Sequence, residues 1–546
     1  MNLIRLRIII ISSVIISFLI IIRIIYLSTL NPMDFVLYEK NEFNYNRGNI
    51  YDKNGKILAI SDYFYSIYVN PNEITNKRDF SDKVSNIIKI SKKEIFDKIN
   101  TNKNFVWIKR FLDEDIYLKL KNENIKGLYF KKEYKRVYPN NRLLSHTLGF
   151  TDIDNRGVEG LEKSYNNFLI SEPDLNEKEE KNNGLNIYLT IDANIQAVAE
   201  YCLKNGVERE NADIGTLIFM DGKSGEIIAM ASYPDFDPNR FTEHKQEDFR
   251  NPAIFNQYEP GSVFKVFTIA SLLDMGYVTE NDYWVCDGIF EKNGNKIKCT
   301  GIHGKINIAG IMKYSCNDAT LQASDRMLSK EFYYYLKNFD FGEYTGINLL
   351  GEQRGLLRDL NNWSSRSKMA ISIGQEISVN ALQIVKAATT FINDGIMLEP
   401  LLVKSIKDVN SKTIKEFTRK EIRRVIKNGI SKIIVDSMIE STATGGSVRR
   451  LKIEGIEFAA KSGTAQVFDT KLNRYSEDRV TSSLLVLFPA NNPRYIIYTV
   501  YHNPKGKIKW GGIICAYLLN DFISNIIGYM DFDLIEKVKI NEKDIK

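Results

Sequence analysis

The 546-residue sequence predicts an α+β protein built on an antiparallel sheet flanked by helices, preceded by one N-terminal membrane-spanning helix. The sheet is predicted because strand-like segments lie at both ends of the larger C-terminal region, with many helical patterns between them. The membrane helix is predicted because Ile8 to Ile22 contains no charge, and apolar residues continue past Arg23 to Leu30. That length suffices for a bilayer, which needs about 20 residues.

The charges around this apolar run predict its orientation. Arg5 and Arg7 precede the run, whereas acidic residues follow it, which favours a cytoplasmic N-terminus. No small-residue cleavage site follows, so a retained anchor is favoured over a cleaved signal peptide. Arg23 is near the far end of the run, where its head group can reach the interface. We therefore expect a single-pass protein of the cytoplasmic membrane, with almost the whole chain outside the cytoplasm.

The overall composition is that of an ordinary globular protein. Hydrophobic residues make up 44% and charged residues 26% of the chain. The net charge of +6 is spread through a lysine-rich sequence and forms no basic cluster, and the sequence contains no nucleic-acid-binding motif. We expect no nucleic-acid partner.

The first extracytoplasmic region mixes strands and helices. Residues 46–71 alternate strand-like runs around a turn at 52–55, and charged helical patterns follow from about 81 to 122. Residues 171–184 are polar and charged and indicate a boundary. We predict three parts: an anchor at 1–30, an intermediate domain at 31–184 and a C-terminal domain at 185–546.

The C-terminal region contains the elements of the predicted sheet. A strand at 185–192 precedes a helix at 194–210. Residues 215–234 and 482–502 each have the pattern of a β-hairpin, and 511–530 has that of a terminal helix.

The five cysteines are too few for a disulfide scaffold in a chain of this length. Cys286 and Cys299 flank the turn-like sequence FEKNGNK, and we predict that they form a disulfide. The four histidines are scattered without metal-ligand spacing, which argues against zinc. We expect the remaining cysteines to be buried thiols: Cys202, Cys316 and Cys515.

The stretch EPGSVFKVFTIASLLD, residues 259–274, places one lysine in an apolar helix. Such a helix is usually buried, and burying an unpaired ammonium is costly. Lys265 lies one helical turn after Ser262, which follows a Pro-Gly helix start. A hydroxyl nucleophile needs an adjacent base, and a lysine in apolar surroundings has a lowered pKa. The spacing therefore suggests a nucleophilic Ser262 with Lys265 as its base.

Two further motifs complete the set that serine acyl-transfer enzymes use. KYSCNDA contains Ser315 and Asn317, and FAAKSGTAQ contains Lys461. Ser315 can relay a proton to a leaving amine, and Asn317 can hold a substrate amide. Lys461 offers positive potential for a substrate carboxylate. The residues after Lys461 complete the expected substrate-binding strand: Ser462, Gly463 and Thr464. Gly463 lets substrate backbone lie against the strand. The N–H groups of Ser262 and Thr464 could form an oxyanion hole.

On these motifs the sequence resembles the class B penicillin-binding proteins over nearly its whole length. The intermediate domain carries RGNIYDKNGKILA, RVYP and GVEGLEKSYNNFL, and the C-terminal domain carries LTIDANIQ, NQYEPGSVFKVFT, HGKINIAGIMKYSCNDA, SIGQEISVNALQI and AAKSGTAQVF. Two positions depart from the usual pattern. Ala460 stands where glycine often precedes the lysine, and Glu376 stands where glycine is common.

The resemblance implies an elongated pedestal at 31–184 and a penicillin-recognising transpeptidase domain at 185–546. It implies that Ser262 is acylated by a peptidoglycan stem peptide with release of the terminal D-alanine, and that an amine of a neighbouring strand then forms the cross-link. β-Lactam antibiotics would acylate the same serine. No metal or organic cofactor is implied, and the glycan polymerase must be a separate membrane partner.

Several alternatives share part of this evidence. A serine β-lactamase has the same motifs but does not need residues 1–185, and a β-lactam sensor needs further membrane spans. A non-catalytic scaffold in the division machinery would not need the intact reactive residues. Septal synthesis during cell division is favoured over lateral-wall elongation by QYEPGSVFKVFT, by GVEGLEKSYNNFL, by Arg23 before IIYL and by the absence of an appended repeat domain. Division proteins are therefore expected partners.

Overall fold

The computed structural model describes residues 17–18, 21, 46–170, 184–469 and 474–529. The chain divides into two units, Met1–Asn44 and Tyr45–Lys546. In the first unit, Ser17, Phe18 and Ile21 are described, and all three are helical. The predicted membrane span from Ile8 to Leu30, with Arg23, therefore lies almost entirely outside the described residues.

The predicted antiparallel sheet is the centre of the C-terminal region. It has five strands in the order β16-β17-β18-β6-β7, and every neighbouring pair is antiparallel. Both predicted hairpins are confirmed, since each forms two adjacent strands of this sheet. The strands span Ile214–Asp221 (β6), Ile227–Tyr233 (β7), Ala459–Asp469 (β16), Arg474–Phe488 (β17) and Tyr495–His502 (β18).

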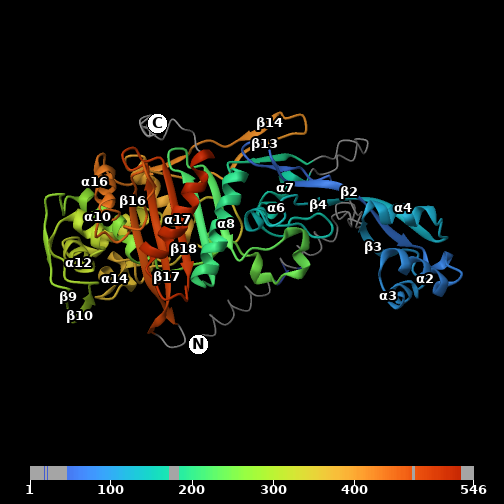
Figure 1. Ribbon diagram of the computed structural model, residues 1–546, viewed down its shortest axis with the longest axis horizontal. Coiled ribbons are helices and arrows are strands. Elements are labelled where there is room, and N and C mark those ends of the chain that lie inside the picture. The colour runs from blue at the N-terminus through green and yellow to red at the C-terminus, as the bar shows by residue number, and fades with distance from the viewer. Residues whose placement is uncertain (1–16, 19–20, 22–45, 171–183, 470–473, 530–546) are drawn as a thin grey trace, which may run out of the picture. The chain divides into compact units, whose positions relative to one another are not determined.

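Two helices cover one face of this sheet (Figure 1). They are α8 (Ala193–Glu210) and α17 (Gly511–Ile526), and their apolar side chains form one core with those of the strands. The stretch Gly511–Tyr529 is the one helical segment in the described part of the chain with the length and apolarity of a membrane span. More than half of it is buried, so here it serves as a core helix.

The opposite face carries the largest hydrophobic core. Within it, α10 (Lys265–Met275) is buried at every position except its last, as expected for a helix that is apolar nearly all round. This face also carries α9 (Pro252–Phe255), α11 (Ile308–Tyr314), α12 (Asn317–Asp325), α13 (Ser329–Asn338), α14 (Ser367–Ser372), α15 (Ala381–Ile392) and α16 (Ile430–Ile439).

Three pairs of short strands accompany these helices. Strand β9 (Ile289–Lys292) and strand β10 (Asn295–Lys298) form the hairpin predicted between Cys286 and Cys299. The other pairs are β8 (Trp284–Cys286) with β11 (Gly304–Ile306), and β12 (Ile396–Leu398) with β15 (Glu421–Arg424).

A second sheet joins the intermediate region to the C-terminal region. Its order is β14-β13-β5-β1-β2-β3, and β4 also pairs with β2. Strand β5 pairs in parallel with β1, so the strand pairing crosses the predicted domain boundary at 184/185. That boundary stays a prediction. The strands are β1 (Ile50–Tyr51), β2 (Ile57–Val69), β3 (Val106–Leu112), β4 (Leu128–Val137), β5 (Asn186–Leu189), β13 (Val403–Lys407) and β14 (Thr413–Glu416).

The helices of the intermediate region are shorter than the sequence suggested. They are α2 (Lys77–Ile88), α3 (Lys92–Ile99) and α4 (Glu114–Asn122), packed on β2 and β3 around a separate apolar core. The expected helical run from 81 to 122 is therefore wrong at β3, where VWIKRFL pairs with β2. Short helices α5 (Ser145–Leu148), α6 (Gly160–Ser164) and α7 (Asn166–Leu169) follow β4.

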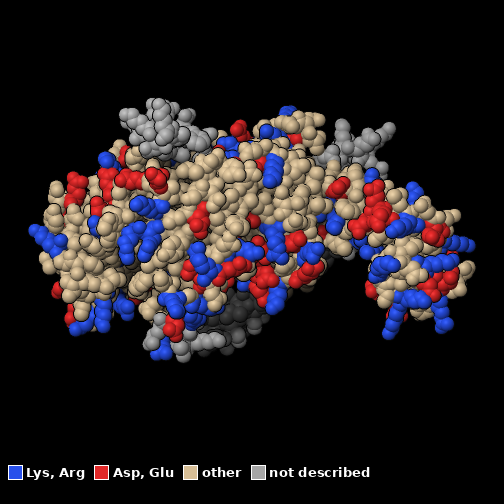
Figure 2. Space-filling view, in the orientation of Figure 1, with Lys and Arg blue, Asp and Glu red and all other residues tan. Residues whose placement is uncertain are grey.

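Basic and acidic side chains are interspersed on the face shown in Figure 2. This distribution agrees with a net charge that comes from general composition.

Three sequence motifs of the intermediate region meet at one buried carboxylate. Glu162 is fully buried and forms ion pairs with Arg47 and with Arg136, whose Nε lies 2.6 Å from Glu162 Oε1. Arg136 Nη1 also donates to the Gly48 carbonyl at 2.8 Å. Burial alone would raise the pKa of Glu162, but the two guanidinium groups hold it below its ordinary value. The ion pairs thus connect segments from 47 to 162 through one charge.

We predict that Glu162→Gln lowers the free energy of unfolding by about 3–5 kcal/mol, because it leaves two buried guanidinium charges without a counter-charge. Urea unfolding of the full chain measures this. The matched control is Glu94→Gln, which breaks an exposed pair with Lys98 at 2.8 Å and should change stability by about 0.5 kcal/mol or less. Equal unfolding midpoints for the two variants would contradict the role assigned to Glu162.

Candidate active site

Ser262 lies in a short 3-10 turn, Gly261–Phe264, that leads directly into α10. The turn depends on two glycines with positive φ. Gly261 has φ +55 and its N–H donates to the Gly374 carbonyl at 3.0 Å. A Cβ on Gly374, which has φ +80, would lie 2.1 Å from the Gly261 carbonyl oxygen. This close backbone contact holds Ser262, which is half-buried, at the start of the helix.

Lys265 is fully buried, one turn after Ser262, as the sequence predicted. Its Nζ donates to the Ser315 carbonyl at 2.5 Å, to Asn317 Oδ1 at 2.7 Å and, at 3.4 Å, to Ser315 Oγ. Burial lowers the pKa of Lys265 to about 8. In the described part of the chain the ammonium is thus bonded to Ser315 and Asn317, while the Lys265 N–H donates to the Ser262 carbonyl.

Lys461 reaches the same hydroxyl from strand β16. It is fully buried on β16, and its Nζ donates to Ser315 Oγ at 2.8 Å and to the Ser462 carbonyl at 2.9 Å. Burial and, secondly, the charge of Lys265 hold the pKa of Lys461 well below its ordinary value. The structure therefore brings Lys265, Ser315, Asn317 and Lys461 into one hydrogen-bonded network.

The segment with Ser315 and Asn317 is held in a specific backbone conformation. Ser315 follows α11 with φ +55 and ψ +41, which is a left-handed conformation uncommon for serine. Asn317 begins α12, and its Nδ2 donates to the Lys298 carbonyl at 3.0 Å. Because Asn317 Oδ1 also accepts a hydrogen bond from Lys265, the Asn317 side chain positions this lysine.

Strand β16 forms the edge of the five-stranded sheet and lies beside the turn that carries Ser262. A Cβ on Gly463 would lie 2.6 Å from both the Pro260 carbonyl oxygen and Ser483 Oγ, so glycine is needed for this approach. Thr464 Oγ1 accepts from the Gly511 N–H at 3.0 Å. The expected oxyanion hole from Ser262 and Thr464, and the substrate-binding role of Ser462, stay predictions.

A cavity of about 830 Å³ lies next to this site. Its lining includes Gln257–Glu259, just before the Ser262 turn, and Ala465–Phe468, just after the β16 motif. Glu259 accepts a hydrogen bond from the Tyr475 hydroxyl at 3.0 Å, and burial raises the pKa of Glu259 to about 7. Glu376, which stands where the penicillin-binding proteins commonly have glycine, has φ +57. Glycine adopts this backbone conformation readily, which explains why it suits the position.

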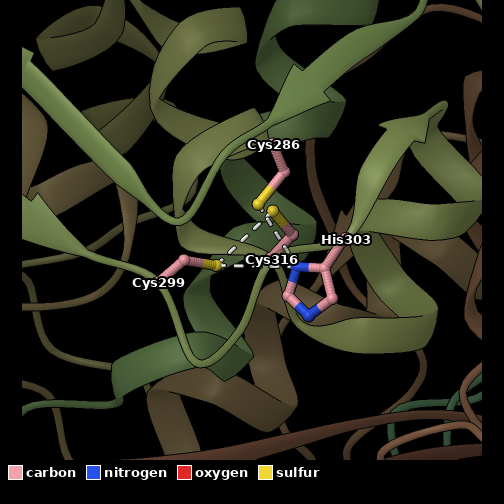
Figure 3. A group of neighbouring side chains, drawn as sticks. All are labelled: Cys286, Cys299, His303 and Cys316. Atoms are coloured by element: carbon pink, nitrogen blue, oxygen red, sulfur yellow. Dashed lines mark hydrogen bonds between the residues drawn. The ribbon is translucent and has the colours of Figure 1, made fainter.

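Three cysteines and a histidine gather behind the Ser315 segment (Figure 3). Cys286, Cys299 and Cys316 are free thiols, so the predicted Cys286–Cys299 disulfide is wrong. Cys299 Sγ lies 3.6 Å from Cys316 Sγ, and His303 Nδ1 lies 3.4 Å from Cys286 Sγ. The prediction of buried thiols is confirmed for Cys202, Cys316 and Cys515. Sequence reasoning missed this cluster, although three of the five cysteines and His303 fall between 286 and 316.

Comparison with known proteins gives two family matches. The penicillin binding protein transpeptidase domain matches residues 215–524, and the penicillin-binding protein dimerisation domain matches residues 43–194.

Individual relatives align over most of this chain. Stage V sporulation protein D of Bacillus subtilis (strain 168) is 30% identical over 505 residues, covering 88% of this chain and 78% of the relative. The peptidoglycan D,D-transpeptidase FtsI of Escherichia coli (strain K12) is 27% identical over 510 residues, covering 89% and 84%.

Solved structures share the fold. Penicillin binding protein 2X of Streptococcus thermophilus has a TM-score of 0.73 at 23% identity, covering 92% of this chain and 82% of that one. Penicillin binding protein 3 of Mycobacterium tuberculosis, in complex with aztreonam, has a TM-score of 0.71 at 21% identity, covering 88% and 96%.

Proposed function

Because this chain belongs to the penicillin-binding proteins with a transpeptidase domain, we propose that it is a peptidoglycan D,D-transpeptidase that cross-links stem peptides and binds β-lactam antibiotics. One observation supports the chemistry most directly. A fully buried lysine, one turn after a half-buried serine, is bonded to Ser315 and Asn317.

The first step is acylation of Ser262. Its Oγ attacks the carbonyl carbon of the penultimate D-alanine, and the Oγ proton passes to unprotonated Lys265. The lowered pKa of Lys265 means that about one molecule in ten has this lysine neutral at pH 7. The peptide bond then breaks, and the terminal D-alanine leaves with a proton. N–H groups aimed at the developing oxyanion, those of Ser262 and Thr464, lower the barrier.

Ser315 carries the proton to the leaving amine. Its hydroxyl lies 2.8 Å from Lys461 Nζ and 3.4 Å from Lys265 Nζ, so it connects the base to the second ammonium. In the second step the acceptor amine attacks the acyl-enzyme, and the same groups move its proton in the opposite direction. Ser262 is released and the new peptide bond is the cross-link.

The edge of β16 receives the donor peptide. An extended peptide can add to an exposed sheet edge by backbone hydrogen bonds, and this edge lies beside the Ser262 turn. Lys461 supplies positive potential for the terminal carboxylate, and Ser462, Gly463 and Thr464 lie along the peptide. The cavity between Gln257–Glu259 and Ala465–Phe468 offers room for the rest of the stem.

We place the anchor at 1–30, the pedestal at 31–184 and the transpeptidase domain at 185–546, with the anchor spanning the cytoplasmic membrane and the other two outside the cytoplasm. We further assign the enzyme to septal wall synthesis, with a separate membrane glycan polymerase and division proteins as partners. The pedestal motifs and the likeness to FtsI of Escherichia coli support this assignment.

We predict that treatment with penicillin adds one adduct to the intact mass and that the adduct maps to Ser262. Ser262→Ala should lose it completely, whereas Ser271→Ala, a buried serine later on α10, should keep it. Labelling that survives Ser262→Ala would contradict the assignment of the nucleophile. Slow release of the adduct separates a transpeptidase from a β-lactamase, which must hydrolyse it rapidly.

We predict that the rate constant of acylation rises with pH and levels off above about pH 8, because only neutral Lys265 accepts the proton. Lys265→Arg keeps a positive charge but holds its proton, so acylation should fall about 10²–10⁴-fold at pH 7. Stopped-flow measurement with a chromogenic β-lactam gives both values. Near-normal acylation by the arginine variant would refute the role of Lys265 as base.

We predict that depletion of the protein gives filaments without septa and that a tagged copy gathers at midcell. Rounded cells with normal septation, or uniform labelling of the lateral wall, would assign the enzyme to elongation. Neither outcome changes the chemistry at Ser262.

A further inference from the structure

Four potential metal ligands converge directly behind the Ser315–Asn317 segment. Cys286, Cys299, His303 and Cys316 place their three sulfurs and one ring nitrogen within 4.8 Å of one another. Figure 3 shows these side chains pointing toward one another. Cys286 and Cys316 are buried, and Cys299 and His303 are half-buried. Cys299 and His303 lie four residues apart, whereas Cys286 and Cys316 join them from the end of β8 and the start of α12.

Three of the six distances among the four ligand atoms match the edges of a tetrahedron around zinc. Bond lengths of about 2.3 Å to sulfur and about 2.0 Å to nitrogen give sulfur–sulfur edges of about 3.8 Å and sulfur–nitrogen edges of about 3.5 Å. Cys299 Sγ lies 3.6 Å from Cys316 Sγ. His303 Nδ1 lies 3.4 Å from Cys286 Sγ and 3.7 Å from Cys299 Sγ. We propose that these four residues bind one zinc ion.

Backbone N–H groups already point at two of the sulfurs. The Asn317 N–H donates to Cys299 Sγ at 3.2 Å, and the Ala319 N–H donates to Cys316 Sγ at 3.3 Å. Cys316 is also the N-cap of α12, where the helix dipole favours a thiolate. Such contacts to ligand atoms orient them and stabilise their deprotonated form. The His303 ring is held in place by stacking on Tyr314, with ring centroids 5.1 Å apart.

Three thiolates and one imidazole favour zinc over magnesium or calcium, which prefer oxygen ligands. Four protein ligands complete the tetrahedron, so the site has no position for water or substrate and is structural. On binding, the three thiols release their protons to solvent and the ion gains three thiolate bonds and one nitrogen bond. The acyl transfer proposed for Ser262 still proceeds without metal chemistry.

The location of the site gives it a consequence for Ser315. Cys316 stands between Ser315 and Asn317, and Cys299 binds the Asn317 N–H. The ion therefore ties the end of hairpin β9–β10, strand β8 and the start of α12 together. This connection holds Ser315 in its left-handed conformation, in reach of Lys265 and Lys461. Zinc acts here as a positioning element for the Ser315–Asn317 segment.

The test uses the full chain purified under reducing conditions without chelator. Elemental analysis should find about one zinc per chain. Replacing zinc with cobalt should give the intense thiolate-to-metal absorption of a tetrahedral site. A thiol reagent under native conditions should react with Cys286, Cys299 and Cys316 much faster once a chelator has removed the metal. These readouts do not depend on the activity of Ser262, so they fail or succeed separately from the proposed function.

Variants distinguish this cluster from adventitious binding. Cys286→Ser, Cys299→Ser and His303→Gln should each lower zinc content, whereas Cys202→Ser removes a buried thiol on α8 and should keep it. Chelation should slow β-lactam acylation about 10-fold or more, with recovery when zinc is returned. The proposal is overturned if the reduced wild-type chain binds no zinc, if it binds iron instead, or if peptide mapping finds Cys299 disulfide-bonded to Cys316 in protein from its native compartment.

Discussion

Two ammonium groups without solvent exposure share the hydroxyl of Ser315, and the rest of the catalytic region is arranged around this contact. Lys265 reaches Ser315 from α10, and Lys461 reaches it from β16. Removing an ammonium from water is costly unless it is paired or loses its proton. Here no carboxylate is among the groups that these two lysines bond in the described structure. Burial therefore lowers the pKa of both lysines, and for Lys265 this is the property that a base for Ser262 requires.

Such a network works only if three elements hold their positions independently. Helix α10 is fixed by the main apolar core, and the 3-10 turn before it is fixed by the Gly261–Gly374 contact. Strand β16 is fixed by its long ladder with β17. The Ser315–Asn317 segment is a loop with a strained residue, and it depends on Lys298, on the lysines and on the cysteine–histidine cluster. A metal at that cluster would give the third element a rigidity comparable with that of the other two.

The sequence was sufficient to predict the hairpins, the covering helices and the three motifs that meet at Ser315, because each has a local pattern of its own. It was insufficient where the outcome depends on contacts between distant segments. The charged sequence of β3 predicts a helix, because its pairing with β2 is not encoded locally. The spacing of Cys286 and Cys299 around a turn predicts a disulfide, but Cys299 Sγ contacts Cys316 and His303 instead. Glu162 belonged to a recognised motif, yet its link to Arg47 and Arg136 emerged only from the fold.

The proposed acylation of Ser262 depends on burial making Lys265 a base near neutral pH. A direct measurement is an NMR titration of the full chain with isotope-labelled lysine side chains, with Lys265→Met to identify the resonance. We expect a lysine resonance that titrates with a pKa of about 8 and is absent from the variant. A Lys265 resonance that titrates near the ordinary lysine value of about 10.4 would contradict it.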